Sequence, residues 1–466
     1  MKNKYLDLIE QTGSWPQEEF QLEEAQLQWH GLPLMDIIKQ YGTPLRLTYL
    51  PKISDNIQRA KRWFNVAMAK SDYQGSYNYC YCTKSSHFQF VIEEALRNDI
   101  HLETSSAFDI NIIEAMEAEG KITQDRYVVC NGFKRPQYVD NIAQLINSGW
   151  QNVIPVLDNR EELPQIMDKV IPGRKVQVGI RIASEEEPKF EFYTSRLGLG
   201  YQDIMPFYAQ HIQPTEHVEL KMLHFFINTG IKDTAYYWNE LLKCVNVYIQ
   251  LKTQCPTLDS LNIGGGFPVK NSLTFDYDYA HMAEEIIAQI KTQCAQAGVP
   301  EPDIFTEFGS FTVAESGANL YSVIGEKKQN DREKWYMIDS SFMTTLPDSW
   351  AINKRFVMMA INRWDTKYHR VLLGGLTCDS DDYYNSEQHA NAIFLPELDD
   401  EEPQYIGFFN TGAYQESLSG FGGLQHCLIP SPKHVVIQRD ETTGEYHTRL
   451  FAKEQSHKSM LKILGY

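Results

Sequence analysis

Short apolar runs alternate with segments of helical periodicity through the first two-thirds of the chain. The runs are rich in β-branched and aromatic residues, as buried strands are, whereas the segments between them repeat apolar residues every three or four positions. The predicted strands are 77–82, 99–104, 127–131, 153–158, 176–182, 219–227, 260–263 and 304–307. Eight strand–helix pairs predict a (β/α)8 barrel of the TIM type over residues 48–314, with an open doubly wound sheet as the alternative.

The helical alternation fades after about residue 315. Apolar runs at 335–338, 370–373, 405–409 and 434–437 are typical of antiparallel strands. We therefore expect a second, mainly antiparallel β domain over residues 315–466, joined by an N-terminal segment, 1–47. The predicted fold class is α/β, a barrel with an added β domain.

Composition and charge narrow the function classes. The chain has 466 residues and a formal net charge of −18, which argues against nucleic-acid binding. The charge suits attraction of a cationic small molecule, although solubility alone is the commoner reason for it. No apolar run is long enough for a membrane span, and Asp7 and Glu10 interrupt the start, where a secretory signal needs apolar residues.

The eight cysteines form no Cys-x-x-Cys pair, and no paired-His spacing typical of zinc occurs, so we predict no metal site. Several cysteines lie in apolar runs, where a free thiol behaves as a small hydrophobe. We expect a protein of the reducing cytoplasm.

Lys84 directly follows the first predicted strand. Active sites of such barrels lie at the carboxyl ends of the strands, and a lysine there can lose its proton and form a Schiff base with a carbonyl. The common alternative is a lysine that only caps a strand.

Other candidates follow later strands of the same barrel. Gly264, Gly265 and Gly266 follow the seventh strand, where backbone N–H groups can approach an anion, although flexible turns use glycine as well. Glu307 ends the eighth strand and Arg181 the fifth, and either could be a simple salt-bridge partner. A lysine, an anion cradle and a carboxylate at one barrel mouth point to pyridoxal 5'-phosphate.

The order of these elements resembles the barrel-type family of pyridoxal-phosphate decarboxylases, which includes ornithine, diaminopimelate and biosynthetic arginine decarboxylases. The likeness runs from Thr43 to Tyr414. Four segments match family motifs, the last being the most specific: Tyr-Cys-Thr-Lys at 81–84, His-Leu-Glu-Thr-Ser-Ser at 101–106, Thr-Ser-Arg-Leu-Gly at 194–198, and Leu-Thr-Cys-Asp-Ser-Asp at 376–381. Leu-Pro-Asp-Ser-Trp at 346–350 and Gly-Ala-Tyr-Gln-Glu-Ser-Leu at 412–418 resemble the arginine branch.

The resemblance implies roles for individual residues. Lys84 would hold the cofactor, Glu307 would keep its pyridine nitrogen protonated, and Cys378 would return a proton to the substrate. Asp379 and Asp382 would bind the substrate. The other implied cofactor contacts are Glu103, Ser106, Arg181, Phe226, Thr229, Gly264, Gly265, Gly266, Gly309 and Tyr414. Because Cys378 and Asp379 come from the partner subunit in this family, a homodimer with shared sites is implied, and a further assembly to a tetramer stays open.

Two departures from the family pattern fall at the site itself. The usual His-x-His-x-Gly-Ser becomes His-Phe-Phe-Ile-Asn-Thr at 224–229, which puts Phe226 where a histidine stacks on the cofactor. Glu-Pro-Gly-Arg becomes Glu-Phe-Gly-Ser at 307–310, which removes an arginine from the phosphate. One charge-assisted hydrogen bond is worth roughly 1.5–3 kcal/mol, so we expect cofactor affinity to fall about tenfold to a hundredfold.

The predicted function is decarboxylation of L-arginine to agmatine and CO2 in polyamine biosynthesis. One alternative is decarboxylation or racemisation of another amino acid, such as ornithine, lysine or diaminopimelate. The other is a catalytically silent relative that binds a partner protein. A need for a divalent metal is left open.

Overall fold

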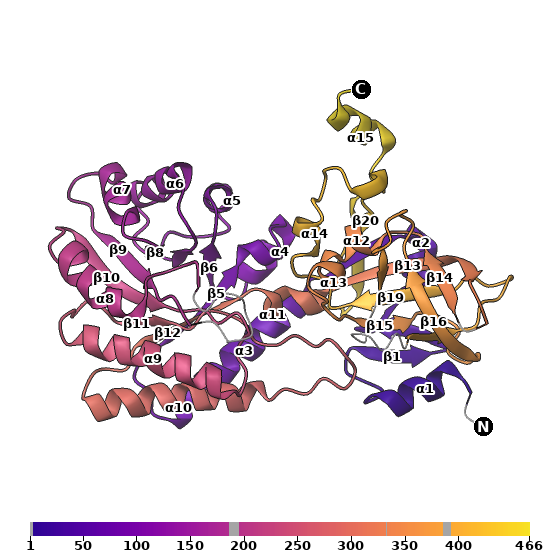
Figure 1. Cartoon of the computed structure of the whole chain (residues 1–466), viewed down its shortest axis with the longest axis horizontal. Helices are drawn as coiled ribbons and strands as arrows, with labels where there is room; N and C mark the ends of the chain where they lie inside the picture. Colours follow the sequence, from indigo (N-terminus) through magenta and orange to yellow (C-terminus); the bar gives the residue numbers. More distant parts are fainter. Residues whose placement is uncertain (1–2, 186–194, 332, 385–392) are drawn as a thin grey trace. The chain divides into compact units, whose positions relative to one another are not determined.

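The structure, a computed structural model, describes residues 3–185, 195–331, 333–384 and 393–466. The chain forms two compact units (Figure 1). The barrel unit comprises Ser54–Pro268 and Tyr277–Thr312. The β unit comprises Met1–Ile53, Val269–Asp276 and Val313–Tyr466, so it contains both ends of the chain. The barrel is thus inserted into the β unit.

Eight parallel strands close the barrel in sequence order, and β9 pairs with β10 to complete the ring. The closed ring confirms the predicted (β/α)8 barrel and rules out an open sheet. Its strands are β5 (Tyr77–Cys82), β6 (His101–Thr104), β7 (Val128–Cys130), β8 (Val153–Leu157), β9 (Val176–Arg181), β10 (Val218–His224), β11 (Ser260–Asn262) and β12 (Asp303–Phe308).

Helices connect the strands. They are α3 (Pro51–Lys70), α4 (Gln89–Leu96), α5 (Ala107–Ala118), α6 (Pro136–Asn147), α7 (Glu162–Lys169), α8 (Tyr201–Phe207), α9 (Ala235–Lys252), α10 (Tyr279–Ala297) and α11 (Ser310–Val313). Apolar side chains from several strands fill the barrel interior: Cys80, Val129, Ile154, Val156, Met222 and Phe305. This packed interior leaves only the rims for polar chemistry.

The main sheet of the β unit is mixed. Most of its strand pairs are antiparallel, as predicted, but β14 pairs in parallel with β16, and β4 with β20. Parallel pairs arise because these partners are far apart in the chain, where no tight hairpin joins them. The strands are β4 (Leu45–Tyr49), β13 (Gly317–Lys328), β14 (Lys334–Ile338), β15 (Val357–Ala360), β16 (Tyr368–Gly374), β17 (Tyr383–Tyr384), β18 (Ile393–Pro396), β19 (Tyr405–Phe409), β20 (Lys433–Arg439) and β21 (Tyr446–Ala452).

A small antiparallel sheet and short helices complete the β unit. The sheet contains β1 (Phe20–Glu23), β2 (Gln26–Trp29) and β3 (Leu32–Pro33), and the helices are α1 (Tyr5–Thr12), α2 (Leu34–Tyr41), α12 (Phe342–Thr345), α13 (Pro347–Ala351), α14 (Gln415–Leu418) and α15 (His457–Leu464). Trp29 and Trp364 are fully buried in its apolar core. Across the described parts of both units, no helix combines the length and apolarity that crossing a bilayer requires.

Candidate active site

Lys84 lies at the carboxyl-terminal rim of the barrel. Strand β5 ends at Cys82, as the sequence pattern predicted, and Lys84 occupies the short helical turn Thr83–Ser85 that follows. Two hydrogen bonds hold this turn: the Thr83 hydroxyl donates to the Glu103 carbonyl at 3.0 Å, and the Ser85 hydroxyl to the Cys82 carbonyl at 2.8 Å. The backbone that carries the lysine is therefore fixed on both sides.

The Lys84 amine forms an ion pair with Glu103. Its Nζ lies 3.1 and 3.2 Å from the two carboxylate oxygens. The Glu103 side chain is fully buried at β6, whereas that of Lys84 remains 42% exposed. The buried Glu103 carboxylate thus anchors the Lys84 amine, while the lysine side chain remains accessible at the rim.

Glu307 lies near the end of β12 in a dense set of donors. Asn131 Nδ2 lies 2.9 Å from both carboxylate oxygens, Asn262 Nδ2 lies 2.7 Å from Oε1, and His224 Nε2 lies 2.9 Å from Oε2. Asn131 also donates to Glu103 at 3.0 Å, which links the two buried carboxylates. One amide thus joins the Lys84–Glu103 pair to Glu307.

These donors decide the charge of Glu307. Burial by itself would raise the pKa of this carboxyl, but the charge and hydrogen bond of His224, the charge of Lys84 and the Asn131 amide lower it to about 2. Glu307 is therefore ionised at neutral pH. A buried carboxylate of this kind can keep a neighbouring pyridine nitrogen protonated.

The triple glycine follows β11 in a conformation that needs glycine. Gly264 and Gly266 have φ values of +69° and +111°. A Cβ on Gly265 would lie 2.2 Å from the Glu307 carbonyl oxygen. Close packing therefore accounts for the glycines on its own, and their predicted contact with a phosphate stays a prediction.

Arg181 ends β9 with an unsatisfied donor. Its Nε is buried and has no hydrogen-bond partner among the described residues. Burial lowers the pKa of Arg181, and the negative charge of Glu307 opposes that shift. A buried guanidinium nitrogen without an acceptor fits a site that receives an anionic group.

The remaining predicted cofactor contacts of the barrel unit lie in loops. Strand β10 ends at His224, three residues before its predicted end, so Phe226 and Thr229 belong to the following loop. Ser106 caps α5, where its hydroxyl accepts from Asp109 N at 3.3 Å. Gly309 directly precedes α11. Thr194 of the predicted 194–198 motif lies outside the described residues.

Four predicted residues belong to the β unit. Cys378 and Asp379 lie in the loop after β16, and the Cys378 thiol is exposed. Asp382 is buried, and its carboxylate accepts hydrogen bonds from Phe342 N at 2.8 Å, from Thr377 N at 3.0 Å and from the Thr377 hydroxyl at 2.7 Å. These contacts give Asp382 a structural role in the loop. Tyr414 precedes α14 with a φ of +69°.

Three partners of Glu307 were not among the predicted site residues: Asn131, His224 and Asn262. Asn131 directly follows β7, while His224 and Asn262 are the last residues of β10 and β11. A search for polar residues at the ends of all eight strands would have found them.

The described residues fit pyridoxal 5'-phosphate. They offer an accessible amine on Lys84, an ionised buried carboxylate on Glu307 and an unpaired guanidinium nitrogen on Arg181. Cys82, Glu103 and Glu307 also lie close enough together to resemble a metal-binding group. However, burial raises the pKa of the Cys82 thiol well above its ordinary value, and a thiol that keeps its proton is a poor metal ligand, so the cluster does not favour a metal.

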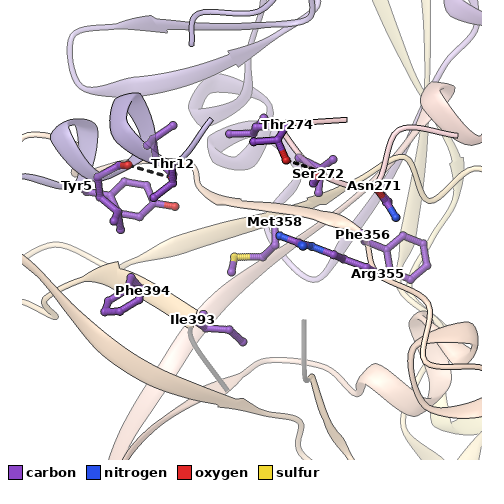
Figure 2. Close-up of a pocket in the computed structure, with 14 residues that line it drawn as sticks. Tyr5, Thr12, Asn271, Ser272, Thr274, Arg355, Phe356, Met358, Ile393 and Phe394 are labelled. Carbon is purple, nitrogen blue, oxygen red and sulfur yellow. Dashed lines mark hydrogen bonds between the residues drawn. The ribbon is translucent and has the colours of Figure 1, made fainter. Parts of the chain in front are cut away.

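A separate cavity of about 380 Å³ lies within the β unit (Figure 2). Side chains of α1, of the segment 271–274 and of the region around β15 surround it, with Arg355 as its charged member. None of the predicted site residues lines it.

The barrel fold and the rim geometry define the site of a pyridoxal-phosphate enzyme. Residues 54–314 match the family model described as "Pyridoxal-dependent decarboxylase, pyridoxal binding domain". The chain belongs to this family, and pyridoxal phosphate is its cofactor.

Curated relatives and solved structures give the same picture. A biosynthetic arginine decarboxylase of Marinobacter nauticus is 21% identical over 86% of this chain and 81% of its own length. One of Prochlorococcus marinus is 21% identical over 92% and 83%. The crystal structure of the Campylobacter jejuni biosynthetic arginine decarboxylase aligns with a TM-score of 0.82 at 21% identity, covering all of this chain and 91% of that one. A diaminopimelate decarboxylase of M. jannaschii aligns with a TM-score of 0.78 at 16% identity, covering 96% and 97%.

Proposed function

We propose that this protein decarboxylates L-arginine to agmatine and CO2. The observation that carries the proposal is the Lys84–Glu103 pair, joined through Asn131 to the ionised Glu307, in a chain that aligns over most of its length with biosynthetic arginine decarboxylases. A protein that only bound a partner would have no chemical need for this buried arrangement of charges.

The residues of the barrel rim hold and charge the cofactor. When bound, pyridoxal phosphate supplies an electron sink for the pair that remains after the carboxylate leaves. Lys84 would provide the amine that binds the cofactor covalently, and Glu307 would keep the proton on the ring nitrogen. Arg181 and the backbone of Gly264–Gly266 would bind the phosphate, and Phe226 would offer its aromatic face to the ring.

Residues of the β unit complete the reaction. Asp379 binds the substrate guanidinium by a charge-assisted hydrogen bond. Cys378 donates a proton to the substrate α-carbon. An ordinary thiol already keeps its proton at neutral pH, and the hydrogen bond with Cys427 and the charge of that thiol raise the pKa of Cys378 further. A thiol that stays protonated suits a proton donor.

We further propose a homodimer in which Cys378 and Asp379 of one subunit serve the site of the other. Subunit mixing tests this: Lys84→Ala and Cys378→Ala chains, each nearly inactive in amine formation, should regain amine formation when they are refolded together. Random pairing makes about half of the dimers mixed. In each mixed dimer one site carries both changes and the other carries none, so about a quarter of all sites are intact. No recovery would place both residues in one subunit.

The substrate is tested by incubating cofactor-loaded protein with L-arginine, L-ornithine, L-lysine and diaminopimelate and measuring CO2 and amine release. We expect kcat/KM for arginine to exceed the others by at least about a hundredfold, because the shorter side chains of the other amino acids lack the guanidinium that would bind Asp379 through two charge-assisted hydrogen bonds. Lys84→Ala is the inactive control. A preference for another amino acid would contradict the arginine assignment, and no CO2 from any of them would contradict decarboxylation itself.

A further inference from the structure

Two cysteines of the β unit, Cys378 and Cys427, have their thiols in contact. Their Sγ atoms lie 3.7 Å apart, although 49 residues separate them in the chain. Both are exposed, whereas the other six cysteines of the chain are buried. The two accessible thiols of this protein are therefore also the two that touch.

The backbone at Cys427 has an unusual conformation. Cys427 and Leu428 have φ values of +55° and +54°, a left-handed conformation that residues with side chains seldom adopt. The neighbouring residues make a second link between the same two segments, because His426 Nε2 lies 3.6 Å from Asp379 Oδ2. Two adjacent contacts thus hold the Cys378 loop against the turn 426–428.

We propose that Cys378 and Cys427 form a redox-active dithiol that closes to an intramolecular disulfide and so switches off the decarboxylase. The sulfurs must move from 3.7 Å to a bond length of about 2.05 Å, which small rotations of two exposed side chains can supply. The inference rests on the proposed role of Cys378 as proton donor.

The oxidant is a hydroperoxide, such as hydrogen peroxide. The minor fraction of either thiol that has released its proton reacts: this thiolate attacks a peroxide oxygen, an S–O bond forms, the O–O bond breaks, and the departing hydroxide takes up the released proton to become water. The second thiol then attacks this sulfenic sulfur: the S–S bond forms, the S–O bond breaks, and a second water leaves. Two sulfurs each lose one electron and the two peroxide oxygens gain them. A thiol reductant reverses the change.

The consequence for activity follows from the lost proton. Cys378 in a disulfide has no S–H bond and cannot protonate the substrate carbon. Neither Cys378 nor Cys427 is among the predicted cofactor contacts of the barrel unit, so cofactor binding should survive oxidation. We therefore expect oxidised protein to retain its cofactor spectrum and to form amine about a hundredfold more slowly, as when a general acid is removed.

The test treats cofactor-loaded full-length protein with hydrogen peroxide, blocks free thiols with iodoacetamide and maps the unreduced peptides by mass spectrometry. We expect a peptide pair joined through Cys378 and Cys427, lighter by two hydrogen atoms, together with inactivation that dithiothreitol reverses. Cys427→Ala should keep full activity when reduced, give no joined peptide and, on long exposure, lose activity irreversibly, because Cys378 then passes on to sulfinic acid. Cys294→Ala, which removes a buried thiol, should behave like the parent.

Two outcomes would overturn the proposal: no joined peptide although Cys378 is oxidised, or a joined peptide in protein of unchanged activity. Peptide mapping needs no turnover, so its result is independent of the substrate. If reduced protein fails to decarboxylate arginine while the joined peptide forms, the proposed arginine decarboxylation is contradicted, but the pairing of Cys378 with Cys427 is still supported.

Discussion

The rim of the barrel and the loop after β16 place their reactive groups in opposite environments. Around Lys84 the charged groups are buried and each is bound by several partners. Cys378, by contrast, is exposed and contacts another thiol on the surface of the β unit. The proposed mechanism assigns a different task to each setting: charge that must stay constant needs a rigid, dry setting, whereas proton delivery needs a group that solvent and substrate can reach.

The largest effect should come from Lys84→Ala. Loss of the amine removes the covalent attachment of the cofactor, so kcat/KM should fall by more than about a thousandfold. Borohydride reduction of the parent followed by peptide mapping should place the cofactor on Lys84. Lys121→Ala, which removes a lysine paired with Glu93 at 3.5 Å, is the matched control and should stay active. Cofactor trapped on any other lysine would contradict the assignment.

Glu307→Gln should come next, with kcat falling about a hundredfold to a thousandfold, the range seen when one preorganised electrostatic group is lost. Glu240→Gln, on α9, is the control, because Glu240 is a buried carboxylate bound by Lys243 and Tyr201. The pH profile adds a second check. Since the pKa of Glu307 is about 2, this carboxylate stays charged as the pH falls to about 3. Protonation of Glu307 should therefore cause no decrease in the activity of the parent above that pH. Unchanged turnover of Glu307→Gln would make Glu307 a structural residue only.

Cys378→Ala should slow amine formation about a hundredfold while CO2 release continues. Protonation then occurs at other positions, so slow inactivation during turnover is expected, measured as loss of cofactor absorbance. Cys427→Ala carries the same change at the neighbouring thiol and should be unaffected under reducing conditions. If Cys378→Ala formed agmatine as its sole amine product at the parent rate, Cys378 would not be the proton donor, and the proposed difference between the two regions would be contradicted.

Ser310→Arg should strengthen the barrel site. Ser310 begins α11 where relatives of the family carry an arginine for the phosphate. One added charge-assisted hydrogen bond should lower the cofactor Kd about tenfold to a hundredfold, measured by equilibrium dialysis. Ser310→Gln, long but uncharged, is the control. Equal affinity of the two variants would show that position 310 does not face the phosphate.

The smallest effect on turnover is expected from Asp382→Asn. The change weakens hydrogen bonds from Phe342 N and Thr377, so unfolding of the β unit by urea should lose about 1–3 kcal/mol, with kcat/KM nearly unchanged. Asp381→Asn, one residue earlier and exposed, should leave stability unaltered. A large rise in KM for arginine in Asp382→Asn would instead support the predicted substrate contact.

The barrel was predictable from the sequence because each of its strands is a short apolar run, and a segment of helical periodicity separates it from the next run. Residues at the strand ends converge by geometry alone, which is why Lys84 and Glu307 could be placed on one rim. The mixed pairing of the β unit was not predictable, since nothing local to 45–49 or 433–439 shows which strand each will join. The Cys378–Cys427 contact was missed for the same reason: it depends on a left-handed turn at residues that are not glycine.

The position of β4 has a consequence for how this chain is made. Its neighbours in the sheet are β13 and β20, both of which are synthesised after the whole barrel. At about 5–20 residues per second, the strand waits on the order of tens of seconds on the ribosome before its last partner emerges. Until then one edge of β4 has no strand to pair with, and unpaired edges invite aggregation. Chains that terminate before Lys433 should therefore depend on chaperones even though their barrel sequence is complete.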